Sequence, residues 1–274
     1  MNATREEVTA ALSRIAYSSR GQPSPRARHP FAADRSWAFG DATGTAVRVC
    51  VIDSGIELGV AGLPVGTAAF AVVADDGGTM TVVPDDQGDA AGHGTACASI
   101  IAGLAPGIEL SSVRILGAGL RGQGTALITA LEWAVANQFH LVNLSLSTKH
   151  PDYREAIRDL VDRAYFQGVT IVASANNRPV VSFPWQFPAV ISAAAHARPD
   201  PEHLECNPEP PVEFFGHGVG VLAAQPGNRF ARLSGNSFAT PHVTGLCARV
   251  LGAHPGLQTP QLKVVLAAIS DNIE

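Results

Sequence analysis

The 274-residue chain has few charged residues and little positive charge. Asp, Glu, Lys and Arg together make up 16% of it, and the net charge at pH 7 is −5. Nucleic-acid-binding domains usually present a basic face, so we expect no nucleic-acid partner. The sequence also contains no run of 18 or more apolar residues, as an apolar transmembrane helix would need. We therefore expect no membrane partner either.

Cysteine is scarce as well. The chain has four, Cys50, Cys97, Cys206 and Cys247, and none forms a CxxC pair. A zinc site needs closer ligand spacing, and a chain with 46% apolar residues does not depend on a disulfide framework. Three of the four lie in apolar segments, which is typical of buried free thiols. We expect no metal and no cofactor, and the sequence leaves the oligomeric state open.

The N-terminal region lacks the apolar segment of a secretory signal, because charged residues interrupt residues 1–20. With Met1 as the native start, we expect a cytoplasmic protein. Residues 4–17 have the apolar spacing of a short helix, and residues 18–36 are rich in Pro, Ser and Arg. This pattern predicts an N-terminal arm or linker over residues 1–36 and one domain over residues 37–274.

From Trp37 onward, short apolar segments alternate with helical patterns. We expect strands near residues 46–52, 68–74, 110–116, 141–147, 169–173 and 189–194, and helices near 94–103, 125–138, 153–167, 237–251 and 259–270. The alternation predicts an α/β fold in which helices cover both faces of a parallel sheet. Ligands of such sheets bind at the carboxyl ends of the strands, so we expect Asp53, Ser145 and Asn176 to lie together there.

Three glycine-flanked segments carry the parts of a nucleophilic site. They place Asp53 in VIDSGI, His93 in AGHGTA and Ser237 in SGNSFATPHVTG. A serine hydroxyl needs a base to become a nucleophile, and a buried carboxylate to orient that base. Taken singly, each residue has an ordinary explanation as a turn, loop or helix-cap residue. Taken together, they predict Ser237 as the nucleophile, His93 as the base and Asp53 as its orienting group.

Two neighbouring residues complicate this assignment. His242 follows Ser237 by five residues on the same expected helix, about a turn and a half away, so we interpret it as structural. Asn176 follows a predicted strand, and its side-chain amide is a candidate donor to an oxyanion. Asn177 is the rival donor, and a loop residue that caps a turn is the ordinary explanation for either.

The same segments resemble the subtilisin-like serine peptidases, or subtilases. The matches, in the family's order, are VIDSGIE at 51–57, GHGTACASIIAG at 92–103, VNLSLS at 142–147, IVASANN at 171–177 and GNSFATPHVTG at 235–245, with a weaker FPAVISAAA at 187–195. The resemblance implies a three-layer α/β sandwich with a mostly parallel sheet of about seven strands. It also implies hydrolysis of peptide bonds through an acyl-enzyme.

The resemblance further implies where a peptide would bind. Ser145, Leu146 and Ser147 resemble the strand that lines the pocket for the residue before the scissile bond. The stretch from Gly119 to Gly122 resembles the family's second substrate-binding strand. An extended peptide would add its backbone hydrogen bonds between the two.

The chain departs from the family pattern at several positions. Asn236 and Phe238 stand where Thr and Met are usual, and neither change removes a reacting atom. Ala175 replaces the usual Gly beside Asn176, and the segment between Asn177 and Phe183 is short, so we expect a reduced pocket wall. The calcium loop of secreted relatives is missing after Gly103.

Three functions are consistent with these residues. The first is a serine endopeptidase, with processing of a peptide precursor as a specific role. The second is a peptide ligase or macrocyclase that uses the same triad but transfers the acyl group to an amine. The third, which the intact Asp53, His93, Asn176 and Ser237 disfavour, is an inactive peptide-binding scaffold. Each function implies a peptide or protein partner.

Overall fold

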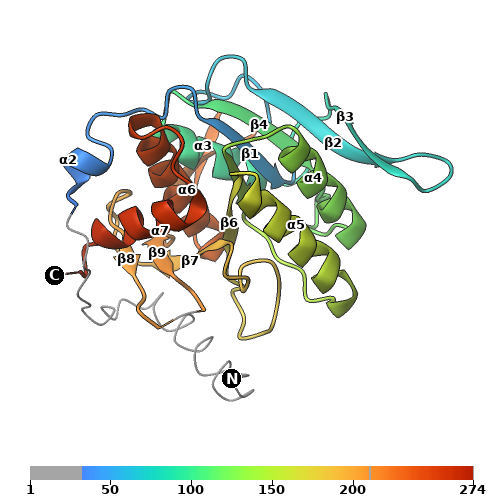
Figure 1. Ribbon diagram of the computed structural model, residues 1–274. Helices are drawn as coiled ribbons and strands as arrows, with labels where there is room; N and C mark the ends of the chain where they lie inside the picture. Colours follow the sequence, from blue (N-terminus) through green and yellow to red (C-terminus); the bar gives the residue numbers. More distant parts are fainter. Residues whose placement is uncertain (1–32, 210, 274) are drawn as a thin grey trace.

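The computed structural model describes residues 33–209 and 211–273, and these residues form a nine-stranded sheet and a separate two-stranded hairpin (Figure 1). The strand order in the large sheet is β3-β2-β4-β1-β5-β6-β7-β9-β8. These strands are β1 (Arg48–Asp53), β2 (Ala68–Ala74), β3 (Met80–Pro84), β4 (Glu109–Arg114), β5 (Leu141–Leu144), β6 (Thr170–Ser174), β7 (Ile191–His196), β8 (Glu205–Cys206) and β9 (Phe214–His217).

The seven strands from β2 to β9 in that order run parallel, and β3 and β8 add antiparallel edges. The mostly parallel sheet of about seven strands is therefore confirmed. The central strands are short and apolar on both faces, as a doubly covered sheet requires. Strand β1 illustrates this, because Val49, Cys50, Val51 and Ile52 are all completely buried.

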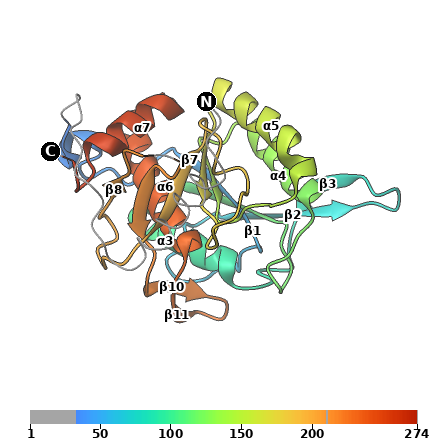
Figure 2. The same cartoon turned by 90° about the horizontal axis from the view of Figure 1, so that it is seen from below.

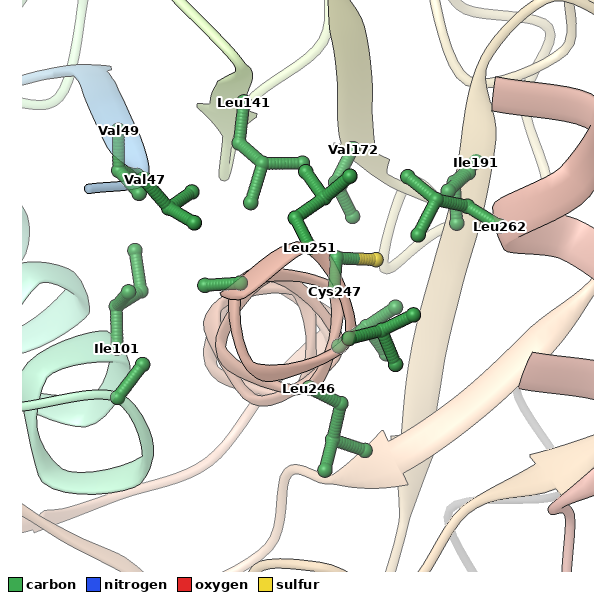
Figure 3. Close-up of a cluster of buried hydrophobic side chains, with 14 of the residues drawn as sticks. Val47, Val49, Ile101, Leu141, Val172, Ile191, Leu246, Cys247, Leu251 and Leu262 are labelled. Atoms are coloured by element: carbon green, nitrogen blue, oxygen red, sulfur yellow. The ribbon is translucent and has the colours of Figure 1, made fainter. Parts of the chain in front are cut away.

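Helices cover both faces of the sheet (Figure 2). Helices α4 (Gly124–Ala136) and α5 (Arg154–Phe166) pack on one face. On the other face lie α3 (His93–Leu104), α6 (Asn236–Ala253) and α7 (Thr259–Ala268). Figure 3 shows α6 end-on, surrounded by Val49, Leu141, Val172 and Ile191 from four strands and by Ile101 from α3. The result is the three-layer sandwich that the sequence predicts, with α6 in the middle of one layer.

A small hairpin, β10 (Val221–Gln225) with β11 (Arg229–Leu233), covers the beginning of α3 and α6. Val221 and Ala223 pack there against Ala96, Ile100 and Phe238. The Gln225 amide also donates a hydrogen bond of 3.1 Å to the carbonyl of Gly92, directly before α3. The hairpin thus holds the loop that leads to His93.

The expected elements agree with the structure to within a few residues, with one exception, and the structure adds strands that were not expected. Strands β8, β9, β10 and β11 are four of these. The region before residue 92 contains a second strand, β3, which pairs with β2 and was not expected. The expected strand over 141–147 ends at Leu144, so Ser145 to Ser147 lie beyond it. The expected helix at 4–17 lies outside the described residues. No helix in the described ranges combines the length and the apolar character needed to cross a membrane.

At the N-terminal end of the described chain, a short helix, α2 (Arg35–Ala38), packs on the domain. The Arg35 guanidinium contacts the Asp271 carboxylate at 2.7 Å, and Ala38 is completely buried. A 3₁₀ turn (Pro151–Tyr153) precedes α5. The proposed boundary between an arm and a domain near residue 36 remains a prediction.

Candidate active site

The end of β1 and the start of α3 bring Asp53 and His93 together. His93 Nδ1 lies 2.8 Å from Asp53 Oδ1, and the Asp53 side chain is completely buried. Asp53 Oδ1 also accepts a hydrogen bond of 2.7 Å from the backbone N–H of Ser54. This contact fixes the imidazole by its Nδ1 atom and leaves Nε2 available to a nucleophile, as a serine-activating base requires.

The surroundings of His93 alter its basicity. Burial on its own lowers the pKa of His93, but its electrostatic interactions and hydrogen bonds with Cys97 and Asp53 together raise it above its ordinary value. Cys97 Sγ lies 3.9 Å from His93 Nδ1, and burial raises the pKa of this thiol. A thiol with a raised pKa is neutral near pH 7, so the Asp53 carboxylate is the charge that acts on His93. Its effect is to favour the imidazolium form.

Ser237 is the second residue of α6, and its position depends on the glycine before the helix. Gly235 has φ of 153° and ψ of 163°, a conformation that residues with a side chain rarely adopt. The turn at Gly235 places Ser237 at the helix N-terminus, where the helix dipole favours negative charge. Cys97 Sγ donates to the Ser237 carbonyl at 3.6 Å, so one buried thiol contacts both His93 and the nucleophile's backbone.

His93 and Ser237 line a common cavity of about 250 Å³. Of the predicted substrate residues, Ser145, Leu146, Ser147 and Ala175 line it too, as does Asn176. No hydrogen bond joins the Ser237 hydroxyl to His93 within the described chain. Such bonds are often long before a substrate is bound, so this geometry is compatible with the predicted roles.

The two candidate oxyanion donors have different partners. Asn177 Oδ1 accepts a hydrogen bond of 2.9 Å from the backbone N–H of Asn236, so Asn177 caps the start of α6. Asn176 Nδ2 donates instead to Ser147 Oγ at 3.2 Å, and its Oδ1 accepts from the backbone N–H of Arg178 at 2.9 Å. One amide proton of Asn176 remains outside these bonds. Asn176 can therefore donate to an oxyanion, but Asn177 also lines the cavity and its Nδ2 makes no hydrogen bond within the described chain, so the choice of Asn176 stays a prediction.

A match to a family model identifies the family. The family model described as "Subtilase family" matches residues 44–271. The chain belongs to the subtilases. It is 28% identical to Subtilisin DY of Bacillus licheniformis over 245 residues, which cover 84% of this chain and 85% of the relative. It is 30% identical to Subtilisin E of Bacillus subtilis (strain 168) over 240 residues, which cover 81% of this chain but only 59% of the relative.

The fold is also that of a solved structure. A cold adapted subtilisin-like serine proteinase superposes with a TM-score of 0.68 at 22% identity, over 99% of this chain and 95% of the other. The chain is thus a subtilisin-like serine endopeptidase by family, with the corresponding three-layer fold. The role of each residue in this subtilase still rests on the geometry described above.

Asn236, one of this subtilase's departures from the usual pattern, ties the nucleophile's helix to the sheet. Its Oδ1 accepts from the backbone N–H of Ala195 at 2.9 Å, and its Nδ2 donates to the Ala175 carbonyl at 3.2 Å. Sequence reasoning treated the residue as a neutral replacement. The one signal for Asn236 in the sequence is its position next to Ser237. The contacts themselves could not be predicted, because the partners lie 41 and 61 residues away along the chain.

The predicted second substrate strand is different in the structure. Residues 117–121 form a turn, in which Gly117 N donates to the Arg121 carbonyl at 3.0 Å. Gly119 and Gly122 are exposed and do not line the cavity, whereas Leu120 between them does. The role of Gly119 and Gly122 in substrate binding stays a prediction. A side chain at position 122 would approach the Ile115 carbonyl too closely, so Gly122 has a structural reason to be glycine.

His242 lies away from this site, as expected. Its side chain is buried, and its Nδ1 donates to the Phe238 carbonyl at 2.8 Å within α6. Burial lowers the pKa of His242 to about 4, so the ring is neutral at physiological pH. Its ring packs on that of His217, with 5.2 Å between the centroids. The interpretation of His242 as a structural residue is supported.

The described residues contain one cluster of three side chains close enough to hold a metal ion. It consists of the acid–base pair, Asp53 and His93, and the neighbouring thiol of Cys97. The four cysteines are free, and Cys50, Cys97 and Cys247 are buried, as the sequence predicts. The absence of a metal from the reaction remains a prediction.

Proposed function

We propose that this subtilase cleaves peptide bonds with Ser237 as nucleophile, His93 as general base and Asp53 as the orienting carboxylate. The observation that carries the proposal is the 2.8 Å contact between His93 and the buried Asp53, at a cavity that Ser237 also lines. His93 Nε2 takes the proton of the Ser237 hydroxyl as Oγ attacks the carbonyl carbon of the substrate. The same proton then goes to the leaving amine, and an acyl-enzyme remains.

Two groups would stabilise the oxyanion of the tetrahedral intermediates. The backbone N–H of Ser237 lies at the start of α6, and the Asn176 side chain lies across the same cavity. Water activated by His93 then hydrolyses the ester and restores the serine. The Asp53 carboxylate stabilises the imidazolium that forms in each step.

The experiment is labelling of the full-length chain with a fluorophosphonate probe. We expect covalent labelling at Ser237, loss of the label in Ser237→Ala, and loss of peptidase activity in the same variant. The matched control is Ser234→Ala, which removes a nearby serine whose hydroxyl accepts from the backbone N–H of Gly220 and does not line the cavity. An unlabelled but folded wild-type chain would instead indicate an inactive scaffold.

We further propose that the substrate is a peptide precursor cleaved at one or a few positions. The cavity is small, Ala175 adds a methyl group to its wall, and His93 is the single titratable residue among the described residues that line it. Such a pocket suits a small, uncharged side chain before the scissile bond. Incubation with a library of precursor peptides, followed by mass spectrometry, tests this. Broad digestion of casein without precursor preference contradicts it, and a product lighter than the hydrolysate by one water indicates peptide transfer.

The cytoplasm is the proposed compartment. Its support is chemical, since four free thiols suit a reducing environment. Fractionation of the source cells, with the chain detected by antibody, tests this. Recovery outside the cytoplasm would overturn it.

A further inference from the structure

A single carboxylate connects the two elements that hold Asp53 and His93. Asp89 lies on the loop between β3 and α3, four residues before His93, and accepts four hydrogen bonds. Its Oδ1 accepts from Ser54 Oγ at 2.7 Å and from the backbone N–H groups of Ala91 at 3.1 Å and Gly92 at 2.8 Å. Its Oδ2 accepts from the backbone N–H of Thr95 at 2.7 Å. Asp89 does not line the substrate cavity.

These bonds replace a missing helix cap. Helix α3 begins at His93, and the residue at its N-cap, Gly92, has no side chain to accept a bond from the first turn. The first N–H groups of a helix need other acceptors. The Asp89 carboxylate accepts from the backbone N–H of Thr95, and Ser54 Oγ accepts from the backbone N–H of Gly94 at 3.0 Å. The negative charge of Asp89 also suits the positive end of the helix dipole.

Ser54 extends this connection to Asp53. The Ser54 side chain bonds to Asp89 and Gly94, while its backbone N–H bonds to Asp53 Oδ1 and its carbonyl accepts from Ala90 at 2.9 Å. The two backbones also touch, because a Cβ atom on Gly94 would lie 2.1 Å from the carbonyl oxygen of Gly55. Asp89 and Ser54 therefore set how the start of α3 sits on the end of β1.

We propose that Asp89 is a positioning residue of the catalytic centre, which fixes the start of α3, and with it the His93 imidazole, against Asp53. The inference rests on the proposed roles of Asp53, His93 and Ser237. Asp89 acts through His93 and not on the substrate. Losing it should therefore slow the chemical step and leave substrate binding nearly unchanged.

The decisive variant is Asp89→Asn in the full-length chain. Asparagine keeps one oxygen acceptor but turns an N–H group towards a backbone N–H, so the carboxylate's four bonds cannot all form. We expect kcat to fall by about 10- to 100-fold with KM nearly unchanged, because small displacements of a catalytic group have effects of this size. The matched control is Asp86→Asn, which makes the same charge change on the same loop. Among the described residues Asp86 bonds only with Gln87, and we expect wild-type kcat.

A double-mutant cycle separates positioning from a general effect on the fold. If Asp89 acts through the Asp53–His93 pair, adding Asp89→Asn to Asp53→Asn should lower the residual kcat by less than about threefold. An equal loss in both backgrounds overturns the proposal, and so does an unchanged kcat in Asp89→Asn alone. If Asp89→Asn does not fold, Ser54→Ala takes its place, since it removes the link from the other side. We expect a several-fold lower kcat with unchanged KM, and a wild-type kcat in that variant overturns the proposal.

Labelling and activity of the wild-type chain distinguish a failure of the Asp89 proposal from a failure of the proposed function. An unlabelled, inactive wild-type chain refutes the triad itself. A labelled, active wild-type chain with an equally active Asp89→Asn variant refutes the role of Asp89 alone.

Discussion

The two sides of the cavity are built differently. On the acid–base side, Asp53 is completely buried, and the elements that carry Asp53 and His93 are joined through Ser54 and Asp89. On the oxyanion side, Asn176 is half-buried, and within the described chain its side chain makes two hydrogen bonds, with Ser147 and with the backbone of Arg178. The first side is fixed by the fold, whereas the second has a polar group that a substrate can engage.

The difference has a chemical reason. A general base must be held in one tautomer and one orientation before the substrate arrives, and a buried carboxylate bonded to the imidazole provides this. An oxyanion donor is needed when charge develops, so one of its donors must stay unused until then. Substitution of Asp53 should thus damage catalysis most, and substitutions among the partners of Asn176 least.

Asp53→Asn should have the largest effect. An amide at this position would no longer hold the imidazole in the tautomer that activates Ser237, and we expect kcat/KM to fall on the order of 10⁴-fold. Steady-state hydrolysis of a fluorogenic peptide measures this, with thermal unfolding to confirm that the variant is folded. A loss of less than tenfold would mean that the buried pair is structural and that the base lies elsewhere.

Asn176→Ala should come second. Removing one oxyanion donor costs about 10²- to 10³-fold in kcat in enzymes of this type. Asn177→Ala is the matched control, because it removes the cap of α6 without removing the proposed donor. We expect that control to lower the free energy of unfolding by about 1 kcal/mol and to retain most of its kcat. If the two variants exchange these effects, Asn177 is the donor.

The pH dependence should follow the raised pKa of His93. The base works only when neutral, so kcat/KM should rise with pH, by about tenfold per unit, up to a midpoint above the value of 6.5 for an ordinary histidine. Stability should move in the opposite sense. The folded pKa is raised, so the His93–Asp53 contact stabilises most below the unfolded pKa and is lost as pH rises through the folded pKa.

Rate profiles and thermal unfolding across the same pH range check both trends. Asp53→Asn should shift the rate midpoint to lower pH, because it removes the charge that favours the imidazolium. A midpoint at or below that of a free histidine would show that burial outweighs the Asp53 carboxylate.

The acid–base side was the part most accessible to prediction. Asp53, His93 and Ser237 stand beside glycines at strand ends and helix starts, and such local signals can be found in a sequence. The same holds for the apolar strands, since a doubly covered parallel sheet leaves continuous apolar runs such as residues 48–52. Local patterns therefore predicted the fold class, and they pointed to His93, Asn176 and Ser237, which line the cavity.

The supporting contacts could not be predicted from the sequence, because they join distant parts of the chain. Asp89 meets Ser54 across 35 residues, and Asn176 meets Ser147 across 29. Whether Leu120 or its neighbouring glycines line the cavity depends on a turn that forms after β4, and spacing alone does not predict it. Strands β3 and β11 give weak signals in the sequence because none of their residues is buried.

Ser147→Ala should have the smallest effect, and it tests whether the Ser147 hydroxyl orients the Asn176 side chain. The Ser147 hydroxyl accepts one N–H of Asn176 at 3.2 Å, which leaves the other N–H to face the reacting carbonyl. A neutral hydrogen bond of this kind contributes about 0.5 to 1.5 kcal/mol, so we expect a loss of about 2- to 10-fold in kcat. In the Asn176→Ala background the same change should have no effect on kcat. A loss in that background would show that Ser147 acts on the substrate directly, and a gain in the wild-type background would show that its bond restrains Asn176 from the oxyanion.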